Sequence, residues 1–538
     1  MQAAAQTWSS IGTVSEQRSA RFMPSLTDLA FLLPAFLLFL KMSGTKRLFS
    51  DGDTGWHIRT GQWILEHHAV PTQDIFSFTK AHQPWFAWEW AWDVTFAGIH
   101  KFWGLVGVGF ITVLLLSLSC ALLYALVAKT SGNNLVGFAV TAFAFCGTTS
   151  HWLARPHLFS WVFFLLFLHL LRKAEGGRTK ALYWLPGLTL IWTNTHGSFF
   201  VGIMLVLTTA LGEAITAFWG KRESPAAVYV KCRPFLLCAA GCLAVTFVNP
   251  YTWHLHRHIF SYLMDGNLLD KIQEYQSTSF HHGQAFFFEG MLLVGLAASF
   301  RCLQRWQVTP ALNILCWAHL ALLSVRNIPL FLMVAAPAVA CLLEEVIRHC
   351  KGSRVVGRFF ASIGDICDEI RPFERIPRVH LTSALAILLL ASLFAGGARG
   401  FEGEFNADLF PIQAISVIAA SPARRIFTYD QWADYLLYRL YPAKQVFIDG
   451  RSDFYGDEIV MTSLHLINAR YDCFKQLRRF AVDMVIVPPD APLSTVLKGR
   501  AGWKLLFDDG KVLVFQAAQP GNVSAAGGKV ERPTLAGA

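Results

Sequence analysis

The hydrophobic positions of the chain fall into long apolar runs, followed by a C-terminal region where apolar and polar residues alternate over shorter distances. A helix needs roughly 20 predominantly apolar residues to cross a bilayer. Candidate runs lie near residues 27–43, 104–128, 134–150, 156–171, 182–195, 198–219, 233–250, 285–300, 309–325, 327–345 and 380–397. The pattern predicts an α-helical polytopic membrane protein with about eleven transmembrane helices, of which the fifth is short.

Composition supports a membrane protein and excludes two other classes. Hydrophobic residues make up 54% of the 538 residues and charged residues 15%, whereas soluble domains carry about 25% charged residues. This deficit excludes an ordinary cytosolic enzyme and a disordered chain. In a soluble protein the net charge of +10 would suggest nucleic acid. Most of the basic excess lies in short loops between apolar runs, so we expect no nucleic-acid partner.

Basic residues orient the chain in the membrane. They cluster in four loops, at 172–180, 221–233, 301–305 and 348–378. Cytoplasmic loops are enriched in Lys and Arg, and with a cytoplasmic N-terminus at 1–26 all four clusters lie on the cytoplasmic side. The transmembrane domain would cover 27–400, with a long outer loop at 44–103. We expect the inner (cytoplasmic) membrane of a bacterium, with the C-terminal domain in the periplasm.

The region at 401–518 is typical of a small extracytoplasmic α/β domain, because strand-like runs alternate with helical stretches. Strands are predicted at 426–428, 445–449 and 484–487, helices at 431–440 and 474–480, and a hairpin from 503–508 and 511–515 across Asp509-Gly510. We expect the tail at 519–538, rich in Gly, Ala, Pro and Ser, to be disordered.

An acidic pair, Asp51 and Asp53, follows the first apolar run. Two carboxylates one residue apart, just above a membrane, can share a divalent cation such as Mg²⁺ or Mn²⁺, or divide the roles of base and metal ligand. They can equally belong to a solvated loop or cap a helix. The stretch at 56–67 has apolar residues at mixed helical spacing and predicts an amphipathic helix in the membrane interface.

Aromatic and basic residues accompany this pair in the outer loop. Four tryptophans are interspersed with two carboxylates: Trp85, Trp88, Trp90 and Trp92, with Glu89 and Asp93. Tryptophans form belts at the headgroup level, and they also stack on sugar rings. Lys46 and Arg47 at the outer end of the first run fit either interfacial snorkelling or contact with an anionic lipid headgroup.

Six more polar side chains stand at the predicted outer ends of apolar runs. Ionisable residues at membrane depth are costly and are therefore candidates for function, although each alone also fits helix capping, snorkelling or a satisfied buried position. Because separate loops bring them to one face, we interpret the set as a site, made of Arg155, His157, Asn194, His196, Glu274 and Arg326.

The first outer loop resembles that of the GT-C glycosyltransferases, polytopic enzymes that use polyprenyl-phosphate-linked sugars. The stretch Asp51-Gly52-Asp53-Thr54-Gly55-Trp56-His57-Ile58-Arg59 looks like the loop of archaeal oligosaccharyltransferase catalytic subunits, where an Asp precedes aromatics, a His or Asn, and an Arg. The resemblance implies that Asp53 is the catalytic or metal-binding carboxylate and that His57 and Arg59 belong to the substrate site.

Short motifs extend the likeness along the chain. Stretches similar to bacterial GT-C-type membrane proteins are Ala154-Arg155-Pro156-His157, Trp192-Thr193-Asn194-Thr195-His196-Gly197, Tyr429-Asp430-Gln431-Trp432 and Phe447-Ile448-Asp449-Gly450-Arg451. Oligosaccharyltransferases read the acceptor peptide with a Trp-Trp-Asp-Tyr-Gly motif. Its nearest match here, Trp432-Ala433-Asp434-Tyr435-Leu436, lacks the second Trp and the Gly, so peptide recognition is not implied.

These observations favour a membrane glycosyltransferase that moves a sugar from a polyprenyl-phosphate-linked donor to a glycan, lipid or protein acceptor. Asp53 would act as the base, with Asp51 assisting it or binding a metal ion. Arg155 and Arg326 would face the phosphate. The remaining candidates would bind substrate, and they are His57, Arg59, His157, Asn194, His196, Glu274 and two expected exposed residues of the outer domain, Asp449 and Arg451, which also fit a turn after a strand.

Two other function classes compete with this one. A transporter of a lipid-linked substrate would carry charged residues near the bilayer midplane, whereas the apolar runs are nearly free of charge. A non-catalytic scaffold or sensor would tolerate loss of the acidic pair.

Overall fold

The computed structural model describes residues 21–281, 283, 285–351, 357–374 and 376–518. The predicted disordered tail at 519–538, and residues 1–20 of the predicted cytoplasmic N-terminus, lie outside this part. The chain forms two compact units. The helical unit comprises Met1–Thr72 and Phe86–Asn406, and the C-terminal unit comprises Gln73–Trp85 and Ala407–Ala538.

The helical unit is built from the following elements. Its longer helices are α3 (Leu26–Leu40), α5 (Asp53–His67), α6 (Trp90–Ser131), α7 (Asn134–Cys146), α8 (His157–Glu175), α9 (Trp184–Thr195), α10 (Phe200–Ile215), α11 (Pro225–Val245), α12 (Trp253–Met264), α14 (Ala285–Gln304), α15 (Val308–Leu323), α16 (Ile328–Cys350), α17 (Gly357–Glu374) and α18 (Leu381–Ala395). The short ones are α4 (Thr45–Leu48), α13 (Gly266–Leu269), η1 (Thr149–His151), η2 (Thr179–Tyr183), η3 (Gly197–Phe199), η4 (Thr216–Gly220), η5 (Gln273–Tyr275) and η6 (Val325–Asn327).

A helix lies at each of the eleven predicted runs, but their number as membrane spans is not confirmed. Among the described residues, six helices are long and apolar enough to cross a membrane, and four further apolar helices are shorter. The remaining run forms α9, which has 12 residues. Since about 20 residues span the hydrocarbon core, length separates the six from the rest.

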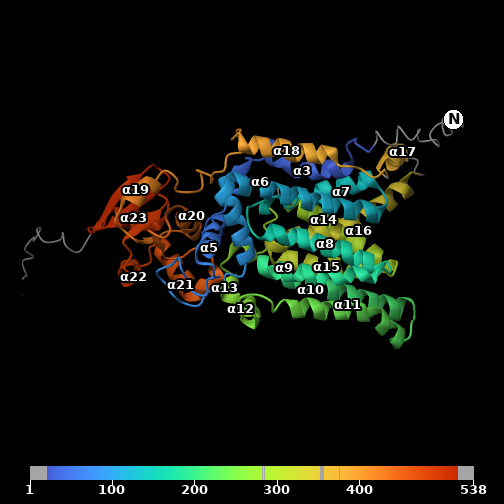
Figure 1. The fold of residues 1–538 in the computed structure, drawn as a ribbon, viewed down its shortest axis with the longest axis horizontal. Coiled ribbons are helices and arrows are strands. Elements are labelled where there is room, and N and C mark those ends of the chain that lie inside the picture. The colour runs from blue at the N-terminus through green and yellow to red at the C-terminus, as the bar shows by residue number, and fades with distance from the viewer. Residues whose placement is uncertain (1–20, 282, 284, 352–356, 375, 519–538) are drawn as a thin grey trace, which may run out of the picture. The chain divides into compact units, whose positions relative to one another are not determined.

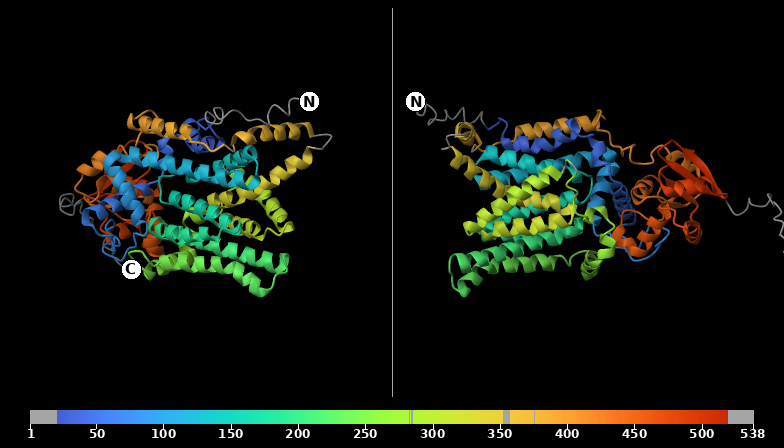
Figure 2. Two further views of the ribbon diagram at one scale, coloured as in Figure 1. Left: turned by 45° about the vertical axis from the view of Figure 1, so that its right-hand side comes forward. Right: turned by 180° about the vertical axis from the view of Figure 1, so that it is seen from behind.

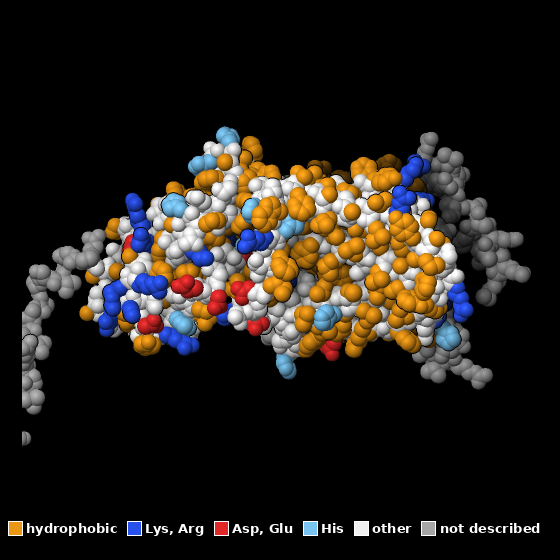
Figure 3. All heavy atoms as spheres, turned by 90° about the horizontal axis from the view of Figure 1, so that it is seen from below, with side chains coloured by type: hydrophobic (Ala, Val, Ile, Leu, Met, Phe, Trp, Pro, Cys, Tyr) orange, Lys and Arg blue, Asp and Glu red, His pale blue; other side chains and the backbone are white. Residues whose placement is uncertain are grey.

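Burial in the helical unit agrees with a membrane bundle. Every residue of α16 from Ile328 to Ala340 is buried, as expected for a helix that is apolar all round and central. Leu237 on α11 and Leu388 on α18 are 61% and 66% exposed. Hydrophobic side chains cover much of the face that the helices present in Figure 3, which suits contact with lipid.

Two features place the first outer loop at one end of the bundle. Within α6, Gly104 has φ 63° and ψ −161°, so the backbone breaks where the apolar run was predicted to begin, and a helix precedes the span. The helix predicted at 56–67 is present as α5, and it runs across the end of the bundle at a steep angle to α8 and α10 (Figures 1 and 2).

The C-terminal unit is α/β, as predicted. Its strands are β1 (Arg425–Phe427), β2 (Gln445–Val446), β3 (Met484–Val487), β4 (Trp503–Asp508) and β5 (Leu513–Ala517), in the order β2-β1-β3-β5-β4. Its helices are α19 (Ile415–Ala420), α20 (Asp430–Leu440), α21 (Ser452–Ile467), α22 (Cys473–Arg479) and α23 (Pro492–Lys498). β1 is parallel to β2 and β3, and β5 is antiparallel to β3 and β4. The predicted β4–β5 hairpin is therefore confirmed.

A piece of the first outer loop completes this unit. In the segment Gln73–Trp85, the Phe78 amide donates to the Val446 carbonyl at 3.2 Å, and the Val446 amide donates to the Phe76 carbonyl at 3.4 Å. The segment thus covers part of the edge of β2. Sequence alone offered no sign of this, because the segment is more than 300 residues away from the strand that it pairs with.

Candidate functional site

The acidic pair lies at the start of α5. The Asp51 carboxylate accepts a hydrogen bond from the Asp53 amide at 2.9 Å, and Asp53 is the first residue of the helix and 5% exposed. Carboxylates in this position interact favourably with the positive end of the helix dipole. The N-cap residue itself is Gly52, so neither carboxylate occupies the N-cap position that the sequence allowed for.

Both carboxylates, together with a third, meet Arg155. The Arg155 guanidinium lies 3.3 Å from Asp51 Oδ2 and 2.5 Å from Glu274 Oε1, and its other terminal nitrogen forms an ion pair with Asp53 Oδ2. Burial disfavours the charged form of Arg155 and would lower its pKa. The negative charges of the three carboxylates outweigh the effect of burial and raise the pKa of the guanidinium well above its usual value. A planar fork of five donors suits such a position better than the single ammonium of a lysine.

Arg326 extends the network from the other side of Glu274. Its Nε lies 3.4 Å from Glu274 Oε2, its Nη1 donates to the Tyr275 hydroxyl at 2.8 Å, and its guanidinium lies 4.9 Å from the centre of the Tyr275 ring. Burial would raise the pKa of Glu274, but Arg155 and Arg326 hold it well below the usual value. We call Asp51, Asp53, Arg155, Glu274 and Arg326 the carboxylate–guanidinium cluster. With all five groups ionised it carries three negative and two positive charges.

The segment before α8 adds basic and imidazole groups beside this cluster. His157 Nε2 donates to the His151 carbonyl at 2.8 Å, and Arg47 donates to the Thr149 carbonyl at 3.0 Å. The pKa of His151 is lowered to about 4, mainly by burial; Glu274 opposes this shift, and Arg326, Arg155 and Arg47 add to it. His151 is therefore neutral at physiological pH. Lys46, by contrast, is exposed.

A second group of polar residues lies in the same unit. His57 Nδ1 is 2.6 Å from Asp93 Oδ1 and its Nε2 is 3.4 Å from Glu89 Oε2, while His196 Nε2 is 3.5 Å from Glu89 Oε1. Burial lowers the pKa of both His57 and His196, so both rings are neutral. We call these four residues the Glu89 cluster.

The Glu89 cluster is held in place by hydroxyl groups. Ser160 and Ser198 lie 2.8 and 2.7 Å from His196 Nδ1, and the Ser198 amide donates to the same nitrogen at 3.4 Å. Nδ1 is therefore an acceptor, and Nε2 carries the proton toward Glu89. The sequence assigns no role to Glu89 and Asp93, and their closeness to His57 and His196 is the feature of the candidate site that sequence reasoning missed.

Two predicted substrate residues, Asn194 and Arg59, make the contacts described here with residues outside both clusters. Asn194 accepts from Trp90 Nε1 at 2.8 Å and donates to the Leu190 and Val248 carbonyls at 2.9 and 3.0 Å, so its amide ties α9 to the start of α6 and the end of α11. Arg59 donates to Gln62 within α5 at 2.7 Å. Their substrate roles stay predictions.

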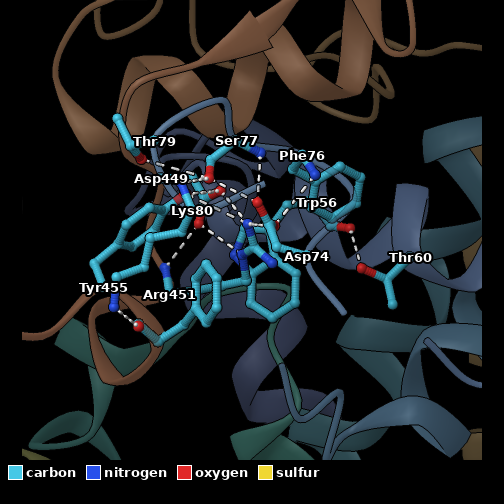
Figure 4. A network of polar contacts seen from close by, with 12 residues as sticks. Trp56, Thr60, Asp74, Phe76, Ser77, Thr79, Lys80, Asp449, Arg451 and Tyr455 are labelled. Carbon is cyan, nitrogen blue, oxygen red and sulfur yellow. Dashed lines mark hydrogen bonds and ion pairs between the residues drawn. The ribbon is translucent and has the colours of Figure 1, made fainter. Parts of the chain in front are cut away.

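Asp449 and Arg451 differ from expectation because they are buried rather than exposed. Their exposed fractions are 1% and 2%. Arg451 Nη2 lies 2.6 Å from Asp449 Oδ2 and 2.7 Å from Asp74 Oδ1, and Tyr455 donates to Asp449 at 2.7 Å (Figure 4). The guanidinium also lies 4.4 Å from the Trp85 ring centre. Asp74 and Trp85 come from the segment Gln73–Trp85, and this segment is the reason that the pair is covered.

The site contains carboxylate groups that could bind a cation, but each of them already forms an ion pair. Asp51, Asp53 and Glu274 supply the carboxylates that Mg²⁺ or Mn²⁺ prefers, yet each is already paired with Arg155. Within the described part of the chain, no group of three or more His, Cys, Asp or Glu side chains is arranged to hold a metal ion. With Arg155 in place, the set does not fit a resident divalent cation.

Comparison with known proteins identifies similar solved structures. No family model matches the sequence, and no curated protein matches it. The oligosaccharyltransferase AglB of Archaeoglobus fulgidus, in complex with an inhibitory peptide and a dolichol-phosphate, has a TM-score of 0.57 and 11% identity over 92% of this chain and 74% of that one. AglB in complex with Zn and sulfate has a TM-score of 0.53 and 10% identity over 92% and 73%. ArnT of Cupriavidus metallidurans in the apo state has a TM-score of 0.47 and 12% identity over 90% and 97%.

At 11% identity, the likeness to AglB concerns the fold. It covers nearly the whole of the chain, including the membrane-type helices and the C-terminal unit. The chain therefore has the fold of the GT-C glycosyltransferases, which its first outer loop resembles.

Proposed function

We propose that this protein is a membrane glycosyltransferase that moves a sugar from a polyprenyl-phosphate-linked donor to an acceptor hydroxyl or amide. The observation that carries the proposal is the carboxylate–guanidinium cluster, in which buried Asp53 lies beside the guanidinium of Arg155 at the start of α5. The GT-C fold supports it. AglB was solved with a dolichol-phosphate, which makes a lipid phosphate a reasonable donor class here.

The reaction needs a group that takes a proton from the acceptor. In the proposed step Asp53, which is ion-paired with Arg155, accepts the proton as the acceptor atom forms a bond to the anomeric carbon. The bond between that carbon and the phosphate oxygen breaks, and polyprenyl phosphate leaves with both electrons. Asp51 accepts the Asp53 amide hydrogen bond, and in this account it positions Asp53.

The departing phosphate needs positive charge. Arg155 and Arg326 provide two guanidiniums. Arg155 is paired with three carboxylates, whereas Arg326 is engaged by a single carboxylate, Glu274, at 3.4 Å, and is the better placed of the two to bind a phosphate. Charge-assisted hydrogen bonds from arginine to phosphate are strong and geometrically specific. Preorganised charge of this kind usually supplies the largest share of catalysis.

The Glu89 cluster is the proposed sugar-binding wall. Glu89 is an acceptor, and neutral His57 and His196 are able to donate or accept, so the group suits a ligand rich in hydroxyls. The Trp88 ring lies near this cluster, because a Cβ added at Gly197, the residue after His196, would be 3.8 Å from it. The acceptor, whether glycan, lipid or protein, and the bacterial inner membrane with a periplasmic C-terminal domain remain parts of the proposal.

The experiment is a donor screen with the purified full chain in detergent or liposomes. Undecaprenyl- and dolichyl-phosphate sugars are supplied singly, and release of the polyprenyl phosphate is followed by mass spectrometry. The proposal expects release from at least one donor. Release from none, by protein that unfolds cooperatively on heating, would shift the assignment toward a scaffold or a transporter.

A further inference from the structure

Arg155 occupies an unusual electrostatic position. One guanidinium contacts three carboxylates, and these come from two segments that are 104 and 119 residues away along the chain. Its side chain is 18% exposed. Without a cation at their centre, three ionised carboxylates in one partly buried place would repel one another.

The contacts with Arg155 take up carboxylate oxygens that a metal ion could otherwise bind. Arg155 is paired with Asp51 Oδ2, Asp53 Oδ2 and Glu274 Oε1, one oxygen from each carboxylate. Mg²⁺ demands near-octahedral oxygen ligands at about 2.1 Å. A divalent cation bound by these same three oxygens would have to displace the guanidinium, while Arg326 stays 3.4 Å from Glu274 as a further positive charge.

We propose that Arg155 is the resident cation of this site and takes the place of a divalent metal ion. It holds the three carboxylates together and supplies the positive charge at their centre, so the wild-type chain has no high-affinity site for Mg²⁺ or Mn²⁺ there. Which cation occupies the cluster is a separate question from whether the protein transfers a sugar, and the two are tested by different measurements.

Mn²⁺ binding by electron paramagnetic resonance tests the proposal on the full chain in detergent. Wild-type protein is expected to leave Mn²⁺ free, whereas Arg155→Ala, which exposes the three carboxylates to one another, is expected to bind one Mn²⁺ at least 10-fold more tightly. Arg301→Ala is the matched control, because Arg301 contacts one carboxylate, Glu345, at 2.9 Å, and its removal should create no site. Adding Glu274→Gln to Arg155→Ala should weaken the new site.

If Arg155→Ala does not fold, Mn²⁺ binding by the wild-type protein tests the proposal by itself. Stoichiometric Mn²⁺ binding by wild-type protein that is lost in Asp53→Asn would overturn the proposal, as would a wild-type melting temperature that falls on treatment with a chelator. Failure of folded Arg155→Ala to bind any Mn²⁺ would overturn it as well, since the carboxylates would then form no cation site. Unchanged wild-type melting in chelator, with Mn²⁺ left free, supports it.

Discussion

Arg155 in the helical unit and Arg451 in the C-terminal unit are each paired with more than one carboxylate. Each lies between carboxylates that distant parts of the chain bring together, Asp53 and Glu274 in one unit and Asp74 and Asp449 in the other. Breaking a buried ion pair by removing one partner typically costs about 3–5 kcal/mol. The difference is access, because Arg155 is 18% exposed and Arg451 only 1%. This difference is why we assign function to the first and structure to the second.

His151 makes the helical unit sensitive to acid. Its pKa falls from 6.5 to about 4 in the folded protein, through burial and then the neighbouring arginines. Between these values the unfolded chain binds a proton that the folded protein does not, so stability is complete above pH 6.5 and decreases as the pH falls. The slope is up to about 1.4 kcal/mol per pH unit for this group. Thermal unfolding from pH 7.5 to 4.5 should show a shallower decline for His151→Gln than for wild type, and equal declines would contradict the account.

Residue types at the site were predictable, but their partners were not. Asp51, Asp53, Arg155, Glu274 and Arg326 stand out in the sequence because charge is rare near apolar runs. Nothing in the sequence indicates that Arg155 bonds to all three carboxylates, since that depends on loops more than 100 residues apart. Asp449 and Arg451 were expected to be exposed for the same reason, because Asp74 is 377 residues from Arg451.

At the level of elements, close packing of α5 on α6 sets the position of the acidic pair. A Cβ added at Gly61 would lie 2.0 Å from the Asp93 carbonyl oxygen and 2.6 Å from Ala97 Cβ. Gly61→Ala should therefore push the helices apart, lower stability by about 1–3 kcal/mol and reduce activity. The readouts are the melting temperature and the transfer rate.

Gly98→Ala is the matched control for this change. Nothing lies within 4 Å of a Cβ added at Gly98, and Ala is favoured over Gly in a helix by about 1 kcal/mol. The variant should be as stable as wild type or more so. If Gly61→Ala behaved in the same way, α5 and α6 would not be in the close contact described.

Arg451 should decide whether the segment Gln73–Trp85 stays on the C-terminal unit. Arg451→Met leaves Asp74 and Asp449 buried without their counter-charge, and we expect a loss of about 3–5 kcal/mol. Hydrogen exchange of the full chain should then show faster exchange at the Ser77 and Phe78 amides, which hydrogen-bond to Asp74 and Val446.

Lys511→Met provides the comparison for that variant. The Lys511–Asp408 pair is 2.7 Å apart but 62% and 75% exposed, and exposed pairs contribute about 1 kcal/mol or less. Exchange in the segment Gln73–Trp85 should be unchanged in Lys511→Met. Protection that is retained in Arg451→Met would show that other contacts hold the segment.

Elements with a strong local pattern were predictable to within a few residues. β3 matches its predicted range at Met484–Val487, because four consecutive apolar residues there are all buried. α21, at Ser452–Ile467, was missed, and its backbone is interrupted at Gly456 with φ 69°. Gly104 likewise breaks α6. Interruptions of this kind dilute the helical periodicity on which the prediction relies.

For the whole molecule, the GT-C fold and the distribution of charge are both consistent with the proposed function. Ten apolar helices lie among the described residues, and the charged residues with strong mutual contacts gather at helix ends and loops instead of mid-helix. This distribution suits chemistry at the membrane surface more than a charged transport path at the bilayer midplane.

Cleavage of a bound donor by Asp53→Asn tests whether Asp53 performs the chemical step of the proposed transfer. We expect this variant to bind a polyprenyl-phosphate sugar and to melt like wild type, while its rate of polyprenyl phosphate release falls by about 10²–10⁴-fold, the usual contribution of a general base. Glu66→Gln, an exposed change on the same helix, should keep the wild-type rate. Wild-type release by Asp53→Asn would contradict the account.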